Sequence, residues 1–434
     1  AYNVAIGYSA GVAVSTGVNN VLVGGLAGDA LTTGNHNVAI GREALGTENA
    51  HGYNVAIGGY ALQDLDAGAD AYNVAIGYSA AKELTTGTYN TVLGAQAMSV
   101  GITTGDYNVA IGNAAGQVLT SGERNVLVGT AAGDALTSGD YNVAVGHGAL
   151  SAEDGHGYNT AIGYKTLNAQ NAGADAYNVA VGYNAGVAVS TGTYNVYMGG
   201  NAGDESTTGS HNVGIGADAI GGVSTASDNT AVGSSALYSI TSGTVNVAIG
   251  RNAGDSLTSG SFNVAVGKSA LAAEDAHGRN VAIGYAALEN QNAGADAYNV
   301  AMGYRAGYAM TTGTLNTLIG GQAGDALTTG NSNTAIGEQS LSAETVGTYN
   351  VAIGREALRL SALSNKSIGI GYGTLYVQAN TPAAVDTYNI AIGHLAGQAI
   401  TTGINNVLVG GLAGDALTTG HYNTAIGHQA LSTE

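Results

Sequence analysis

The 434-residue chain has no cysteine, no tryptophan, one proline and one phenylalanine. The lack of cysteine excludes disulfides, thiol catalysis and cysteine-ligated zinc. The scarcity of bulky aromatic side chains argues against the wide core of an ordinary globular enzyme. Glycine occupies 71 positions, but without a three-residue period and with almost no proline, which excludes collagen.

Charge is scarce and is mostly of one sign. Only 9% of the residues are charged, yet 30 acidic against 11 basic side chains give a net charge of −19. This excess argues against a nucleic-acid or anionic-membrane partner. No apolar run is long enough to span a membrane. Because 45% of the residues are hydrophobic, the chain is not predicted to be disordered.

One short motif recurs along the whole chain. Asn3-Val4-Ala5-Ile6-Gly7 is followed by 24 related pentapeptides, and 19 of the 24 spacings are 17 residues, with three of 19, one of 18 and one of 22. The repeats leave no place for a linker or a second domain. We therefore predict one continuous array over residues 1–434.

Each repeat predicts a strand and two turns. Counting the asparagine as place one, place two is β-branched in every copy, place four is Ile, Val, Leu or Met, and place five is always glycine. Alternation that ends at glycine predicts a strand followed by a turn, and Thr-Thr-Gly marks a second turn. The fold class predicted is all-β: a parallel β-solenoid of about 25 coils that stack through backbone hydrogen bonds.

The alternation also predicts which side chains face inward. We expect places two and four to point into the coil, together with Ala at place eight and Leu at place twelve. Place one is expected to form an asparagine ladder from coil to coil, beginning with Asn3, Asn20, Asn37 and Asn54. Place three holds small or apolar residues and never a charge. We expect it to face outward as an interface stripe that includes Ala5, Leu22, Ala39, Ala56, Leu127, Tyr197, Leu318 and Leu408.

The bulky residues of this stripe correlate with glycine at place six. Leu22 precedes Gly25 and Tyr197 precedes Gly200. Such compensation of volume suggests close packing against another chain. The alternative interpretation is that alanine simply suits a strand flanked by glycine.

The motif resembles repeats of known surface proteins. Asn54-Val55-Ala56-Ile57-Gly58 is similar to the Asn-Ser-Val-Ala-Ile-Gly repeats in the heads of trimeric autotransporter adhesins (YadA-like). It is also similar to the Tyr-Asn-Val-Ala-Ile-Gly repeats of bacterial and phage tail-fibre-like proteins. The resemblance implies a left-handed β-roll, a homotrimer, exposure at the cell surface and an adhesive or spacer role. Residues 389–434 nearly duplicate residues 3–48, so we expect a segment of a longer protein.

Acidic residues and histidines recur around the three coils of 19 residues. Neighbouring coils are expected to bring them to one edge, as Glu48, His51, Asp66 and Asp70, then Glu153, His156 and Asp175, then Glu274, His277 and Asp296. Two interpretations remain open: turn chemistry on protruding loops, or a contact with a glycan or a metal such as Ca²⁺. No resident cofactor is expected.

The leading hypothesis is a structural fibre rather than an enzyme. It predicts the rigid shaft or head of an extracellular, cell-surface or virion appendage, which self-associates and contacts a cell-surface or glycan receptor. Alternatives are a receptor-binding phage tail fibre, a tailspike-like glycosidase and an ice-binding rod. The glycosidase needs paired carboxylates in a groove, and the acids here are scattered. Gly7-Tyr8-Ser9-Ala10-Gly11 matches a hydrolase elbow but falls within the repeat, so no catalytic residue is predicted.

Overall fold

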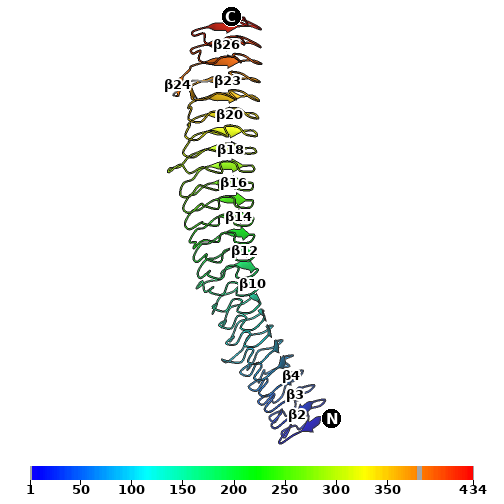
Figure 1. Ribbon diagram of the computed structural model, residues 1–434. Helices are drawn as coiled ribbons and strands as arrows, with labels where there is room; N and C mark the ends of the chain where they lie inside the picture. Colours follow the sequence, from blue (N-terminus) through cyan, green and yellow to red (C-terminus); the bar gives the residue numbers. More distant parts are fainter. Residues whose placement is uncertain (1, 379–383, 434) are drawn as a thin grey trace. The chain divides into compact units, whose positions relative to one another are not determined.

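A computed structural model describes residues 2–378 and 384–433, and within them the chain is an all-β parallel solenoid without helices. It comprises two compact units, residues 1–212 and 213–434. Each predicted repeat forms one coil with a three-residue strand. Within each unit the strands stack one coil above the next (Figure 1).

The first unit contains twelve coils. Their strands are β1 (Val4–Ile6), β2 (Val21–Val23), β3 (Val38–Ile40), β4 (Val55–Ile57), β5 (Val74–Ile76), β6 (Thr91–Leu93), β7 (Val109–Ile111), β8 (Val126–Val128), β9 (Val143–Val145), β10 (Thr160–Ile162), β11 (Val179–Val181) and β12 (Val196–Met198).

The second unit contains thirteen coils and one additional strand pair. The coil strands are β13 (Val213–Ile215), β14 (Thr230–Val232), β15 (Val247–Ile249), β16 (Val264–Val266), β17 (Val281–Ile283), β18 (Val300–Met302), β19 (Thr317–Ile319), β20 (Thr334–Ile336), β21 (Val351–Ile353), β23 (Ile368–Ile370), β25 (Ile390–Ile392), β26 (Val407–Val409) and β27 (Thr424–Ile426). The additional pair is β22 (Ser364–Asn365) with β24 (Val385–Asp386).

Neighbouring coils pair in an unshifted parallel register. Val21 lies opposite Val38 and Leu22 opposite Ala39, so each place meets the same place one coil further on. Outside the strands, the turns are tied in the same way: the Thr32 hydroxyl donates to the Asn49 carbonyl at 2.7 Å. The turns place non-glycine residues at left-handed φ angles in coil after coil. Such angles cost about 1–2 kcal/mol each, so the coils depend on stacking for their stability.

The asparagine ladder runs through the interior. The backbone N–H of Asn37 donates to Asn20 Oδ1 at 2.9 Å, and that of Asn54 donates to Asn37 Oδ1 at 3.0 Å. Within its own coil, Asn20 Nδ2 donates to the Gly34 carbonyl at 2.9 Å. The first member, Asn3, accepts from the Asn20 backbone N–H at 2.9 Å. These side chains replace backbone partners that the turns lack.

The strands face the opposite way from the prediction. Places two and four point outward and are partly exposed, whereas place three is buried inside the chain's own coil. The predicted interface stripe is therefore wrong. Its members line the core, Ala5 of the first coil being the exposed one: Leu22, Ala39, Ala56, Leu127, Tyr197, Leu318 and Leu408 are all fully buried.

The reversal has a steric cause. The buried asparagine and place three lie on the same face of the strand, and leucines from the turns fill the interior opposite them. Only alanine fits in most coils. Where place three is larger, the room comes from glycine at place nine: a Cβ on Gly28 would lie 2.8 Å from Leu22, and a Cβ on Gly203 would lie 2.5 Å from Tyr197. Burial raises the pKa of Tyr197 to about 12.

Candidate functional site

Three of the predicted metal-site carboxylates lie in the core. Glu48, Glu153 and Glu274 occupy place twelve, where most coils have an apolar side chain, and none is exposed. Each is followed three residues later by a half-buried histidine: His51, His156 or His277. Each glutamate therefore lies near its histidine, as the sequence predicted.

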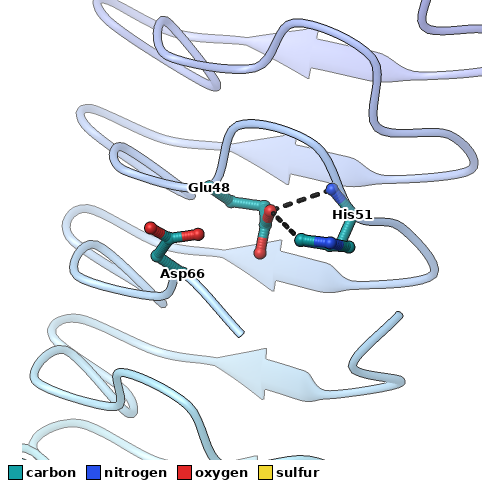
Figure 2. A group of neighbouring side chains, drawn as sticks. All are labelled: Glu48, His51 and Asp66. Carbon is teal, nitrogen blue, oxygen red and sulfur yellow. Dashed lines mark hydrogen bonds and ion pairs between the residues drawn. The ribbon is translucent and has the colours of Figure 1, made fainter. Parts of the chain in front are cut away.

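The first cluster is formed by Glu48, His51 and Asp66 (Figure 2). Glu48 Oε1 accepts the backbone N–H groups of Ala50 and His51 at 3.2 and 3.0 Å and lies 3.3 Å from His51 Nδ1. One ligand-type atom from each of the three side chains lies within 4.8 Å of the others. The spacing suits a cation, but the oxygen nearest the histidine already accepts two backbone hydrogen bonds.

The other two clusters differ in their third member. Asn171 and Asn292 replace the aspartate of the next coil, and the second carboxylate of each cluster comes from the residue after the glutamate, Asp154 or Asp275. Glu153 Oε1 lies 3.3 Å from His156 Nδ1, whereas Glu274 Oε1 lies 3.6 Å from His277 Nδ1. The three clusters therefore share a glutamate and a histidine but not a complete ligand set.

Burial controls the titration of the later two glutamates. Loss of hydration raises the pKa of Glu274 to about 7, and it also raises the pKa of Glu153. The hydrogen bond from the neighbouring histidine and the charge of that histidine act in the opposite direction and lower both pKa values, but their effect is smaller. Oε2 of each carboxylate has no hydrogen-bond partner among the described residues. A raised pKa favours a neutral carboxyl group, which is a poor metal ligand.

Three further predicted residues lie outside the clusters. Each of these aspartates caps a turn, because its Oδ1 accepts the backbone N–H of a glycine one coil earlier at 2.9–3.1 Å: Asp70 from Gly52, Asp175 from Gly157 and Asp296 from Gly278. Asn35 caps Val18 in the same way at 2.8 Å, without any charge. Turn chemistry therefore accounts for these positions.

A fourth buried glutamate shows what place twelve requires. Glu344 is also fully buried, but the sequence analysis did not select it because no histidine follows it. Two residues after Glu344 the chain has Val346, whereas each of the other three glutamates has alanine or glycine at that position and then histidine. Glu344 Oε1 accepts the backbone N–H groups of Gly347 and Leu363 at 2.8 and 3.0 Å, and its Oε2 accepts that of Ser364 at 3.0 Å. A buried carboxylate here can be satisfied by turn amides alone, which favours the structural interpretation of all four.

Two buried glutamines follow the later clusters. Gln170 and Gln291 occupy place twelve one coil after Glu153 and Glu274, and each has an Nε2 without a hydrogen-bond partner among the described residues. An unpaired donor thus follows an unpaired carboxylate oxygen in the same column. The glutamate–glutamine succession is a sequence signal of a polar core column, which hydrophobic periodicity alone did not reveal.

Glu274→Gln is expected to stabilise the protein at alkaline pH. Between about pH 4.5 and 7 the folded state binds a proton more tightly than the unfolded state, so stability falls as pH rises through this range. The neutral variant avoids this loss and should gain about 2 kcal/mol over wild type at pH 8, with little difference at pH 4. Urea denaturation followed by circular dichroism measures both, with His277 and Asp275 unchanged.

The matched control is Glu344→Gln. An amide nitrogen cannot accept the hydrogen bonds that Glu344 receives, so this variant should lose about 2 kcal/mol at pH 8. Equal effects of the two substitutions would contradict the different environments of the two carboxyl groups.

The outward side chains of the strands form a second candidate surface. We define the strand face as the residue before each asparagine together with places two, four and six. In the coil of Asn108 it presents Tyr107 (49% exposed), Val109, Ile111 (36% exposed) and Asn113. Within the described part of the first unit no acidic residue lies on this face, although the chain has 30.

A column of planar side chains forms one edge of the strand face in the first unit. Neighbouring rings stack with centroids 4.9–5.2 Å apart, and Arg124 lies 5.4 and 5.6 Å from the rings on either side. The column consists of His36, Tyr53, Tyr72, Tyr89, Tyr107, Arg124, Tyr141, Tyr158, Tyr177, Tyr194 and His211. The recurrent Tyr-Asn-Val was the signal for it, but the sequence analysis used it only as a resemblance.

No protein-family model matches this chain, and no curated protein matches it significantly. Among residues 2–378 and 384–433, no helix has the length and apolar character needed to cross a membrane.

Proposed function

We propose that the chain is a structural module of an extracellular or virion fibre, in which copies of the solenoid associate as a homotrimer. In this role it is a spacer with an adhesive surface for a cell-surface or glycan receptor and has no chemistry of its own. The observation that carries the proposal is the strand face, which is apolar and partly exposed in coil after coil.

The size of this face supports association. Twelve coils at about 4.8 Å each, with about 20 Å from the tyrosine column to place six, give roughly 1,100 Å² in the first unit. A standard protein interface covers about 800 Å² of each partner. This footprint includes polar side chains such as Asn113 and Arg124, but a mainly apolar face that continues over twelve coils is unusual for a monomer.

The distribution of charge supports it as well. The acidic side chains of the first unit lie on the turns, while its strand face carries only the cations Arg42 and Arg124 and histidines such as His147. Like-charge repulsion between copies is therefore smallest where strand faces meet. Sedimentation should give three times the chain mass of 42.6 kDa, and a monomer at micromolar concentration would reject the proposal.

Charges on the strand face are expected to dissociate the assembly. The double variant Ile76→Lys and Ile111→Lys removes two outward apolar side chains from each copy. The loss of about 3 kcal/mol of binding free energy per interface should weaken association about a hundredfold. Mass photometry measures the shift to single chains, and circular dichroism should be unchanged. Val100→Lys with Val223→Lys is the control, because these exposed valines lie on turns. Dissociation by this control would place the interface elsewhere.

A further inference from the structure

Place six forms a column of its own in the second unit. Lys268, Tyr285 and Tyr304 occupy it in successive coils. The rings of Tyr285 and Tyr304 stack at 5.5 Å with an interplanar angle of 13°, and Lys268 Nζ lies 5.6 Å from the Tyr285 ring centroid. Each coil therefore contributes one ring or one cation to a stack that follows the solenoid.

The stack is interrupted at Gly321. A Cβ on this glycine would have no atom within 4 Å, and its φ is not in the left-handed region. The next coil places the exposed Glu338 in the column, with Arg355 Nε 3.3 Å beyond its Oε2. At about 4.8 Å per coil, the levels of Tyr304 and Glu338 are about 10 Å apart, which leaves room for one planar group. We call this gap the step at Gly321. It is bounded on one side by the ring of Tyr304, which is 55% exposed, and on the other by the carboxylate of Glu338.

Arginines of the same chain show what fits such a step. Arg279 lies between two rings, 5.8 Å from that of Phe262 and 5.3 Å from that of Tyr298, and its Nε is 3.2 Å from Asp296 Oδ2. Arg124 is inserted between two tyrosines in the first unit in the same way. A guanidinium combines the flat shape of a ring with a charge that both a π face and a carboxylate attract.

We propose that the step at Gly321 binds the guanidinium group of an arginine supplied by another molecule, stacked on Tyr304 and paired with Glu338. Tyr304, Gly321 and Glu338 lie at the place-six edge of the strand face in the second unit, whereas the area and charge distribution argued above for association are those of the first unit. Other place-six glycines lack one of its features. At Gly411 the step is filled by His428, whose Nδ1 lies 3.0 Å from the Gly411 carbonyl, and Gly25 is followed by the cation Arg42.

The site is tested by fluorine NMR of protein labelled with 3-fluorotyrosine. Tyr304→Phe identifies the Tyr304 resonance by its loss. N-acetylarginine methylamide should shift this resonance saturably with a dissociation constant in the millimolar range, as expected of an exposed cation–π contact with one ion pair. The citrulline analogue has the same flat shape but no charge and should give no saturable shift. Equal shifts from both compounds, or none from the arginine compound, would overturn the proposal.

Variants localise the effect. Gly321→Arg should occupy the step from within and abolish the response, while Glu338→Gln should weaken binding about threefold. Gly25→Arg, a place-six substitution in the first unit, should leave the response unchanged. A response that persists in Gly321→Arg would refute the site. A neutral peptide with one arginine distinguishes the sources: binding as tight as that of the small compound indicates a protein partner, and binding of the small compound alone indicates a free metabolite.

Discussion

Alanine in place of Gly320 is expected to destabilise the protein by about 3 kcal/mol or more. Gly320 has a φ of +134°, a conformation almost confined to glycine, and a Cβ there would lie 2.5 Å from the carbonyl oxygen of Gly337 in the next coil. Relief would require the coils to separate, which breaks the backbone hydrogen bonds at this level. Urea denaturation followed by circular dichroism measures the loss.

The adjacent residue provides the control. Gly321→Ala adds the same methyl group one residue later, where there is open space and no left-handed φ. Its effect should be within about 0.5 kcal/mol of wild type. If the two alanine variants were equally stable, the close approach of successive glycines at place five would not exist.

Asn125→Leu is expected to cost about 3–5 kcal/mol. Asn125 Nδ2 donates to the Gly139 carbonyl at 2.8 Å, and its Oδ1 accepts the Asn142 backbone N–H at 2.8 Å. Leucine has a similar size but leaves both of these buried groups unpaired, at about 1–3 kcal/mol each. It also loses the bond to Asn108 Oδ1 at 3.1 Å. The same denaturation experiment applies.

Asn113→Leu is the matched control for the ladder. Asn113 is exposed on the strand face, and its single bond, to the Ala95 carbonyl, is accessible to water. Its replacement should change stability by less than about 1 kcal/mol. A similar loss from both substitutions would mean that the buried ladder contributes no more than a surface hydrogen bond.

The chain itself contains one replacement of a ladder residue. Ser367 stands where 24 other coils have asparagine. Its hydroxyl accepts from Gln378 Nε2 at 2.7 Å and pairs with Thr387, while Gln378 Oε1 accepts from Asn389 Nδ2 at 3.3 Å. The longer glutamine thus spans the distance that the serine cannot. This substitution survives because a second side chain supplies the missing amide.

The fold could be predicted because it depends on the period. The 17-residue spacing, the β-branched place two and the glycine at place five are sufficient for a parallel coil with a strand and turns. The direction of the side chains could not be predicted in the same way, because alternation gives two equivalent phases. The prediction placed Val and Ile in the interior and Ala outside, which is the wrong one of the two phases. The buried asparagine, which needs partners inside the coil, is the residue that distinguishes them.

The volume signal was present but was attributed to the wrong glycine. Leu22, Leu318 and Tyr197 each have a glycine at place six and another at place nine. A Cβ added at place six would meet open space, whereas a Cβ added at place nine would clash with the large side chain. The preceding coil distinguishes the two glycines, because a Cβ on Gly11, at place nine of that coil, would also lie 2.6 Å from Leu22. The sequence predicted that the glutamates and histidines lie close together. It could not predict that turn amides donate hydrogen bonds to the glutamates, because the positions of these amides depend on the path of the backbone.

The unshifted register has a consequence for how such a gene can change. Within each unit, neighbouring strands join like to like, as in Val21 with Val38 and Val38 with Val55. Excising or duplicating one whole period therefore restores the same junction and alters only length. Recombination between repeated DNA segments can lengthen or shorten the product without inventing new contacts. A local constraint applies where place three is large. Leu22 needs a glycine at place nine both in the preceding coil and in its own coil, so these two coils can be duplicated or lost only together.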